Sequence, residues 1–176
     1  MNPFDVKKEL ESMTVLCDSR EQDTERARRR LHRIGVPIER TKLDFGDYSV
    51  RCNALDLRAR VAIERKMDLG ELAQCYCGGR KRFENEFERA KYAGAKLYLL
   101  IENGDLNALY KAKYRSRMKP QSFSASLFAW LARYNCQVVF CSEEFSGAVI
   151  HEILYRELKE RLEAMPDEET QTDLHP

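Results

Sequence analysis

Three charged residues near the middle of the chain have the types and spacing that metal-assisted hydrolysis requires. If the segment VAIERK forms a strand, its side chains alternate, so Glu64 and Lys66 share one face while Arg65 points to the other. Residues 53–56 have the composition of a turn, which predicts a β-hairpin with Asp47 opposite Glu64. Two carboxylates and an ammonium group would then converge.

Such a convergence suits the hydrolysis of a phosphodiester. Carboxylate oxygens are ligands of Mg²⁺, which keeps most of its waters and accepts one or two acidic side chains together with a substrate phosphate. The ion would polarise the phosphodiester and lower the pKa of a bound water, while Lys66 would orient that water or neutralise developing charge. The same spacing is also compatible with a plain surface ion pair between Glu64 and Lys66.

Alternating apolar and amphipathic segments predict an α/β domain that positions these residues. The segments expected to form strands are 14–17, 38–43, 48–52, 57–66, 97–101 and 137–140. The segments expected to form helices are 23–34, 68–77, 80–93, 120–134 and 145–165. The continuous apolar run LYLLI is typical of a strand covered on both faces, which places it at the centre of the sheet.

Length and composition favour one soluble domain. With 176 residues, 43% hydrophobic and 34% charged, the chain fits a single domain at 13–164, preceded by an N-terminal extension (1–12) and followed by a disordered acidic tail (165–176). No apolar run approaches the roughly 18 residues of a membrane span, and the polar start differs from a signal peptide. Six cysteines without a CxxC pair favour small buried hydrophobes over zinc ligands.

Basic residues gather in two places although the net charge is only +1. The first run comprises Arg26, Arg28, Arg29, Arg30 and Arg33. The second, KAKYRSRMK, places Lys111, Lys113, Arg115, Arg117 and Lys119 at every second position. If extended, the second run would present its cations on one face suited to a phosphate backbone, although such runs are also found on solvated surfaces.

Three strings, LCDSREQ, LDFGDYSV and AIERKMDLGEL, resemble the nuclease domain of the XPF-type structure-specific endonucleases in their order and gaps. The resemblance covers Met13 to Ile101, and the family is marked by GD, a variable spacer and ERK, here Gly46, Asp47 and residues 64–66. It implies a restriction-endonuclease-like fold, a three-layer α/β/α arrangement with a central mixed β-sheet.

The resemblance also implies roles for individual residues. Asp47, Glu64 and the backbone carbonyl of Arg65 would hold Mg²⁺ or Mn²⁺, with Lys66 positioning the attacking water.

Residues of the first string would assist. Asp18 and Glu21 would support the site from the first strand, and Arg20 would contact the substrate phosphate or brace the acidic residues. Asp44 is a weaker candidate, expected as a turn residue before Gly46.

One position departs from the family pattern. The Asp usually found just beyond ERK is replaced by Gly70, which is flanked by Asp68 and Glu71. Either neighbour would be able to substitute for it, but the preferred interpretation of Asp68 is a charge at a helix N-terminus.

Relatives of this family often carry a helicase or helix-hairpin-helix module, which this chain is too short to include, so DNA would be held in another way. The candidates are the helix start Arg80, Lys81 and Arg82, and the run Lys111, Lys113, Arg115 and Arg117. A solvated helix end is the alternative for the first group. A homodimer or a partner protein that supplies DNA binding is also compatible with the resemblance.

The resulting functional hypothesis is a metal-dependent DNA endonuclease acting at flap, fork or junction DNA in repair or recombination. A non-catalytic branched-DNA binding module, and a nuclease acting on RNA or specific duplex sites, are the alternatives, because no motif reads base edges. The expected location is the cytoplasm of a bacterium, with a phage origin also considered, or the nucleus if the source is eukaryotic.

Overall fold

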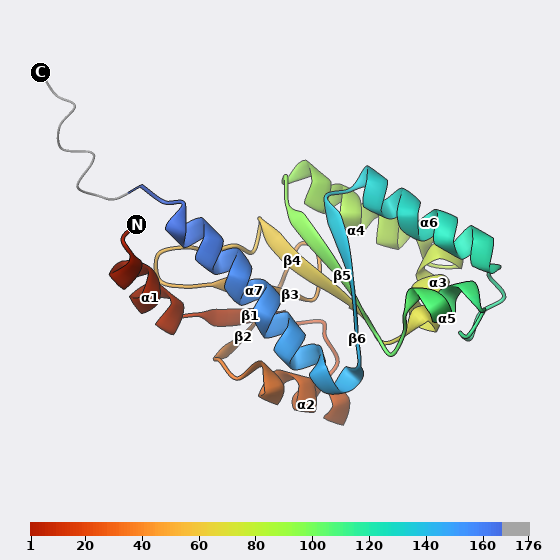
Figure 1. Ribbon diagram of the computed structural model, residues 1–176, viewed down its shortest axis with the longest axis horizontal. Coiled ribbons are helices and arrows are strands. Elements are labelled where there is room, and N and C mark those ends of the chain that lie inside the picture. Colours follow the sequence, from red (N-terminus) through yellow and green to blue (C-terminus); the bar gives the residue numbers. More distant parts are fainter. Residues whose placement is uncertain (167–176) are drawn as a thin grey trace, which may run out of the picture.

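The computed structural model describes residues 1–166 and forms a mixed sheet covered by helices (Figure 1). Its strands are β1 (Thr14–Asp18), β2 (Ile38–Thr41), β3 (Tyr48–Arg51), β4 (Val61–Lys66), β5 (Lys96–Glu102) and β6 (Cys136–Cys141). Its α-helices are α1 (Pro3–Glu11), α2 (Glu25–Ile34), α3 (Leu69–Cys77), α4 (Arg80–Tyr92), α5 (Leu106–Tyr110), α6 (Pro120–Arg133) and α7 (Ser146–Glu163). A short 3₁₀ turn, η1 (Glu143–Phe145), precedes α7.

The strand order is β2-β1-β3-β4-β5-β6. Strand β3 runs antiparallel to both of its neighbours, and every other adjacent pair is parallel. Helices α1, α2 and α7 cover one face of the sheet, while α3 to α6 cover the other (Figure 1). This arrangement confirms the predicted three-layer α/β/α fold with a mixed sheet.

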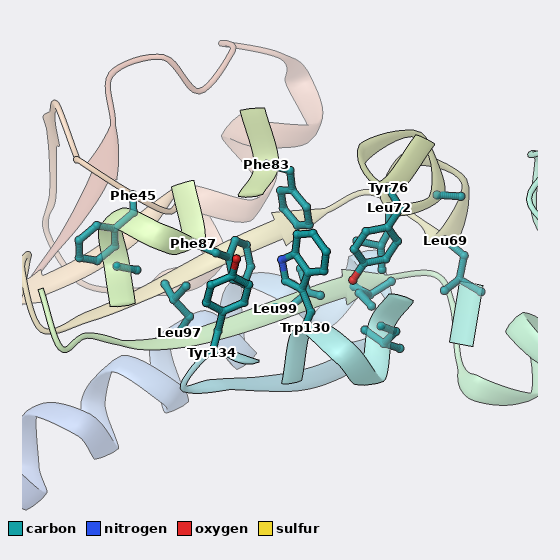
Figure 2. Close-up of a cluster of buried hydrophobic side chains, with 14 of the residues drawn as sticks. Phe45, Leu69, Leu72, Tyr76, Phe83, Phe87, Leu97, Leu99, Trp130 and Tyr134 are labelled. Atoms are coloured by element: carbon teal, nitrogen blue, oxygen red, sulfur yellow. The ribbon is translucent and has the colours of Figure 1, made fainter. Parts of the chain in front are cut away.

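One face of the sheet carries an aromatic core. Phe83 and Phe87 of α4 pack against Trp130 of α6, with Trp130 stacked on Phe83 at a ring-centroid distance of 5.7 Å (Figure 2). Tyr76 of α3 meets the same indole edge-on at 5.0 Å. These rings lie over Leu99 of β5 and confirm the apolar faces that helical spacing predicts for α4 and α6.

The opposite face has an aliphatic core under α7. Ile150, Leu154 and Leu158 of that helix are fully buried against Ile63 of β4 and Leu100 of β5. Strand β4 therefore behaves as its alternation predicts, because Val61 and Ile63 face this core while Ala62 faces the aromatic one.

The structure confirms the predicted register of the hairpin, but the segment that connects its two strands differs from the prediction. The structure pairs Tyr48 with Ile63, which places Asp47 opposite Glu64 as predicted. Residues 57–60, however, are not part of the strand. Asp56 accepts a hydrogen bond from the Arg58 amide at 2.9 Å, an Asx turn that diverts the chain from the ladder before Val61.

The condition set for the basic run is not met, because residues 111–119 form a loop between α5 and α6 and not an extended strand. Two amides at its start, those of Lys111 and Lys113, still bond to α5 carbonyls at 3.0 and 2.8 Å, so the loop begins by closing that helix. Ala112 takes a left-handed conformation with φ +53°. Such a residue cannot continue a strand.

Two helices were not predicted. Helix α1 lies in the segment regarded as an N-terminal extension, where Asn2 caps it by accepting from the amides of Phe4 and Asp5, and it packs against α7. Helix α5 is only one turn long and is capped by Asp105. Most of the predicted disordered tail, residues 167–176, lies outside the described part of the chain.

All six cysteines of the chain lie within the described residues 1–166. All six cysteines are free, and Cys17 and Cys52 are buried. In this part of the chain, no helix combines the length and apolar character needed to cross a membrane.

A close helix crossing at Gly147 gives a first testable prediction. A Cβ atom on Gly147 would lie 2.4 Å from the Arg30 carbonyl oxygen of α2. Gly147→Ala should therefore push α2 and α7 apart and lower the free energy of unfolding by about 1–3 kcal/mol, measured by urea denaturation. Gly78→Ala is the control, because its Cβ would meet no atom closer than 4.0 Å. Equal stability of both variants would contradict the close crossing.

Candidate active site

An open cleft of about 1100 Å³ lies at the ends of β1 and β4 and is walled by α3 and α4. All the residues predicted to be catalytic line it. They are Asp18, Arg20, Glu21, Asp47, Glu64, Arg65 and Lys66. The topology explains this convergence, because β1, β3 and β4 are adjacent in the sheet.

Backbone contacts fix Asp47 at this position. Its amide donates to the Ile63 carbonyl at 2.8 Å, and its own carbonyl accepts from the Asp18 amide at 2.8 Å. Gly46 precedes it with φ +71°, and a Cβ there would lie 2.7 Å from the Ala62 Cβ. Only glycine therefore fits before Asp47.

Glu64 and Lys66 form a buried ion pair on the face of β4 that turns toward the aromatic core. The Lys66 ammonium also lies 5.2 Å from the centre of the Phe83 ring. Burial opposes the charged form of Lys66, but Glu64 and Asp47 outweigh it and raise the pKa of this lysine above its usual value. Lys66 is thus a fixed cation and not a base.

Glu86 of α4 is a third acidic side chain at the site, and the sequence analysis missed it. Its Oε1 accepts from the Gly46 amide at 2.8 Å. Burial raises the pKa of Glu64, and the facing carboxyl of Glu86 raises it further by repulsion and hydrogen bonding. The spacing from Phe83 was a usable signal, since a residue three positions later lies near the same helix face.

The donor set fits a hard divalent cation. Burial, followed by repulsion from Glu64, raises the pKa of Asp47, so the two carboxylates are held together at an electrostatic cost that a cation would relieve. The Arg65 amide donates to Asp47 Oδ2 at 2.8 Å. In a strand, the carbonyl of a residue faces the same edge as its amide, so the Arg65 carbonyl faces this site too.

The side chains of residues 1–166 do not form a ready-made cage of three or more His, Cys, Asp or Glu ligands. Mg²⁺ does not need one, because it takes one or two carboxylates and keeps several waters.

Asp18 and Arg20 hold the loop before Gly46 in place through hydrogen bonds. Asp18 accepts from the Arg20 Nε at 2.7 Å, from its Nη2 at 2.9 Å and from the Leu43 amide at 2.8 Å. Burial alone would raise the pKa of Asp18, but these hydrogen bonds lower it below the usual value. Arg20 also donates to the Leu43 carbonyl at 2.9 Å, which fixes the loop before Gly46.

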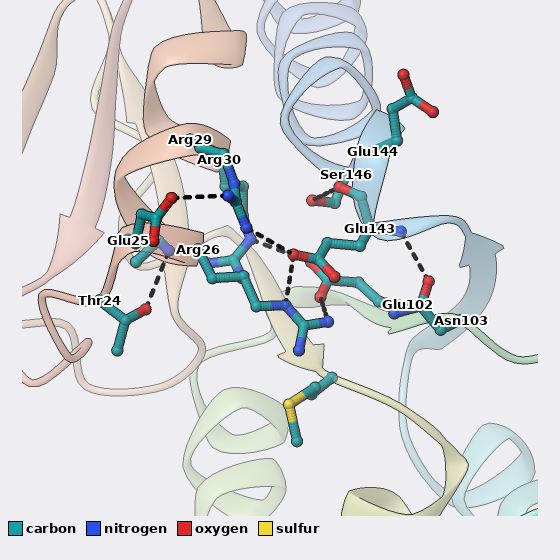
Figure 3. A network of polar contacts seen from close by, with 12 residues as sticks. Thr24, Glu25, Arg26, Arg29, Arg30, Glu102, Asn103, Glu143, Glu144 and Ser146 are labelled. Atoms are coloured by element: carbon teal, nitrogen blue, oxygen red, sulfur yellow. Dashed lines mark hydrogen bonds and ion pairs between the residues drawn. The ribbon is translucent and has the colours of Figure 1, made fainter.

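A buried ionic network lies on the other face of β4 (Figure 3). Its centre is Glu102, fully buried at the end of β5, which contacts Arg30 at 3.0 Å, Arg26 at 3.3 Å and Arg65 at 3.4 Å. Glu21 contacts Arg30 at 3.0 Å and Arg65 at 3.4 Å. Glu21 therefore supports the site by holding arginines.

The predicted DNA-binding residues fall into different places. Lys81 and Arg82 line the cleft, whereas the Arg80 guanidinium lies 5.2 Å from the Trp130 ring centre. The four candidates from the second basic run, Lys111, Lys113, Arg115 and Arg117, are exposed and lie outside the cleft lining. Asp44 is exposed and does not line the cleft, although its carbonyl accepts from the cleft residue Arg89 at 2.8 Å.

Both neighbours of Gly70 accept hydrogen bonds from amides at the start of α3. Asp68 caps α3 by accepting from the Glu71 amide at 2.8 Å, as its preferred interpretation predicts. Glu71 in turn accepts from the Met67 amide at 2.6 Å. Both carboxylates are thus used at the helix start.

Glu102→Gln tests the ionic network. The variant leaves three arginines around a neutral amide, so the free energy of unfolding should fall by about 3–5 kcal/mol, as expected for a broken buried pair. Glu39→Gln is the control, because its ion pair with Arg51 is partly exposed and should contribute at most about 1 kcal/mol. Similar urea midpoints for both variants would show that the network contributes little.

Glu86→Gln tests the third carboxyl. The amide oxygen can still accept from Gly46, but one negative charge is removed, so Mn²⁺ affinity should fall about 10- to 100-fold by calorimetry. Glu84→Gln is the control on the same helix, since Glu84 pairs with Arg133 at 2.9 Å. Unchanged Mn²⁺ affinity in Glu86→Gln would exclude this role.

Comparisons with known proteins find solved structures with a similar fold. Solved structures of XPF from Aeropyrum pernix have TM-scores of 0.61 alone and 0.60 in a complex with DNA, at 21% and 20% identity. The matches cover 86% and 89% of this chain, and 67% and 68% of those chains. At this identity the likeness concerns the fold.

The comparison with curated proteins finds no significant match. A family model, by contrast, matches residues 17–153, which include every residue assigned above to the catalytic cleft. That model describes the ERCC4 domain, and this chain belongs to the ERCC4 domain family of nucleases.

Proposed function

We propose that this chain is a Mg²⁺- or Mn²⁺-dependent endonuclease that cuts DNA at flaps, forks or junctions in repair or recombination. The observation that carries the proposal is the convergence of Asp47, Glu64 and Lys66 at one end of an open, polar cleft. Family membership supports nuclease chemistry. The Aeropyrum pernix XPF structure with DNA supports the class of substrate.

Each residue has a separate task in this proposal. Asp47, Glu64 and the Arg65 carbonyl would hold the metal ion, which when bound supplies a Lewis acid and an activated water. Lys66 keeps its proton, so its ammonium orients the water and stabilises negative charge on the phosphate oxygens. Lys81 and Arg82 supply positive charge along the cleft wall, where the scissile strand would lie.

The alternatives predict different results. A non-catalytic binding module would not require a buried lysine between closely spaced carboxylates. This chain keeps Asp47, Glu64 and Lys66. A nuclease for RNA or specific duplex sites would use the same chemistry, so substrate competition separates it from the proposal.

The test is cleavage of labelled flap, fork, four-way junction and plain duplex DNA, with an RNA duplex, in Mg²⁺, Mn²⁺ or EDTA. Native protein should cut a branched DNA only with metal, and Lys66→Ala should slow the cut by about 10²–10³-fold, as for loss of a charge-stabilising donor. Arg58→Ala is the control, since that exposed arginine pairs with Asp56 far along the hairpin.

Asp47→Ala should abolish cleavage but leave DNA affinity nearly unchanged. Preferred cutting of RNA or of plain duplex would overturn the branched-DNA assignment. Absence of cutting on every substrate with either metal would overturn the nuclease proposal itself.

A further inference from the structure

The loop at residues 111–119, here named the cation loop, carries unneutralised positive charge. All five arginines of α2 pair with carboxylates, so that helix contributes little net field. Within residues 1–166, by contrast, no carboxylate pairs with any of the five exposed cations of the cation loop. They are Lys111, Lys113, Arg115, Arg117 and Lys119.

The cation loop has a defined shape although it is not a strand. The Tyr114 hydroxyl donates to the Met118 carbonyl at 2.8 Å, and the Met118 amide donates to Ser116 Oγ at 3.1 Å. The Tyr114 ring meets Phe123 of α6 edge-on at 5.0 Å. The apolar side chains therefore point into the aromatic core, and the cations are held on the outside.

The same loop is docked against the start of α3. A Cβ on Gly70 would lie 3.2 Å from the Arg115 carbonyl oxygen and 3.5 Å from its amide nitrogen. Helix α3 begins directly after the catalytic strand, and its residue Glu71, together with Met67, lines the cleft. The cleft and the cation loop thus border the same first turn.

Unpaired cations also occur in the cleft at the start of α4, which follows the last turn of α3. Lys81 and Arg82 line the cleft and form no ion pair with carboxylates of the described chain. Two groups of uncompensated charge therefore border α3, with the cation loop at its first turn and Lys81 and Arg82 just beyond its last turn. A polyanion with charges repeated along its length would be attracted to both at once.

We propose that the cation loop is a DNA-binding arm that holds the phosphate backbone of a duplex beside the first turn of α3, while the strand to be cut enters the cleft. This rests on the proposed function for the identity of the nucleic acid. The absence of a side chain at Gly70 lets the loop backbone approach the helix. Gly70 thus serves as the docking site for the arm.

The experiment measures binding of a fluorescent DNA fork by anisotropy in EDTA, where no cleavage occurs. The loop variant replaces Lys111, Lys113, Arg115 and Arg117 by alanine. A control variant replaces four exposed cations that are paired with carboxylates, Arg28, Arg29, Arg58 and Arg156. Both variants lose the same formal charge, so general electrostatics affects them equally.

The loop variant should bind at least about 10-fold more weakly, and its salt slope should fall by about 0.9 for each phosphate that the loop no longer neutralises. The control variant should keep the native slope. Equal weakening of both variants would mean that only net charge matters and would overturn the proposal, as would native affinity in the loop variant.

A second measurement does not depend on removing charge. Hydrogen exchange of the native protein should slow at residues 111–119 when the fork is added. Gly70→Asp should weaken fork binding because its side chain would displace the Arg115 backbone, with unfolding midpoints recorded to confirm that the variant folds. Unchanged exchange in the loop would overturn the proposal.

The outcomes separate this inference from the proposed function. Loop-dependent binding without any metal-dependent cutting would overturn the nuclease and leave the arm. Metal-dependent cutting with a loop variant that binds and cuts as well as native protein would overturn the arm and leave the nuclease.

Discussion

The arrangement of the site depends on one buried carboxylate. Glu102, at the end of β5, holds arginines from α2 and from β4, so it joins a helical layer to the catalytic strand. Arg65 lies between Glu64 and Lys66 in sequence, and side chains of a strand alternate. Anchoring Arg65 on one face therefore commits its two neighbours to the other. A slip of one residue would bury them in the wrong layer.

The opposite face of β4 carries a cluster of carboxylates that repel one another. Asp47, Glu64 and Glu86 are brought together by backbone contacts and by α4, although their charges repel. Lys66 compensates for part of this charge from a buried position. The protein thus holds an arginine-rich ionic network on one side of the sheet and a partly compensated acidic cluster on the other, and members of both line the cleft.

The sequence predicted the residues that local periodicity controls. The alternation in VAIERK and the helical spacing of Phe83 and Phe87 were sufficient to assign faces, and the pairing of Asp47 with Glu64 was correct. The path between them was not predicted. An isolated antiparallel β-bridge joins Arg51 to Asp56, and this register would place Tyr48 opposite residue 59. Tyr48 instead faces Ile63, because a turn after Asp56 shifts the register by four residues. Glu102 was missed because its partners are distant in sequence, so no short pattern reports the contact, whereas for Glu86 the only local signal was its spacing from Phe83.

The contact between Gly46 and Ala62 has a consequence for recognising relatives of this chain. The two residues belong to neighbouring segments, and a Cβ on Gly46 would lie 2.7 Å from the Ala62 Cβ, so a side chain at position 46 needs a wider gap between the segments. In a relative with a side chain at that position, the segment that carries the aspartate would have to move away from the strand that carries the glutamate. The spacing of the acidic pair is therefore coupled to the size of the residues beside it.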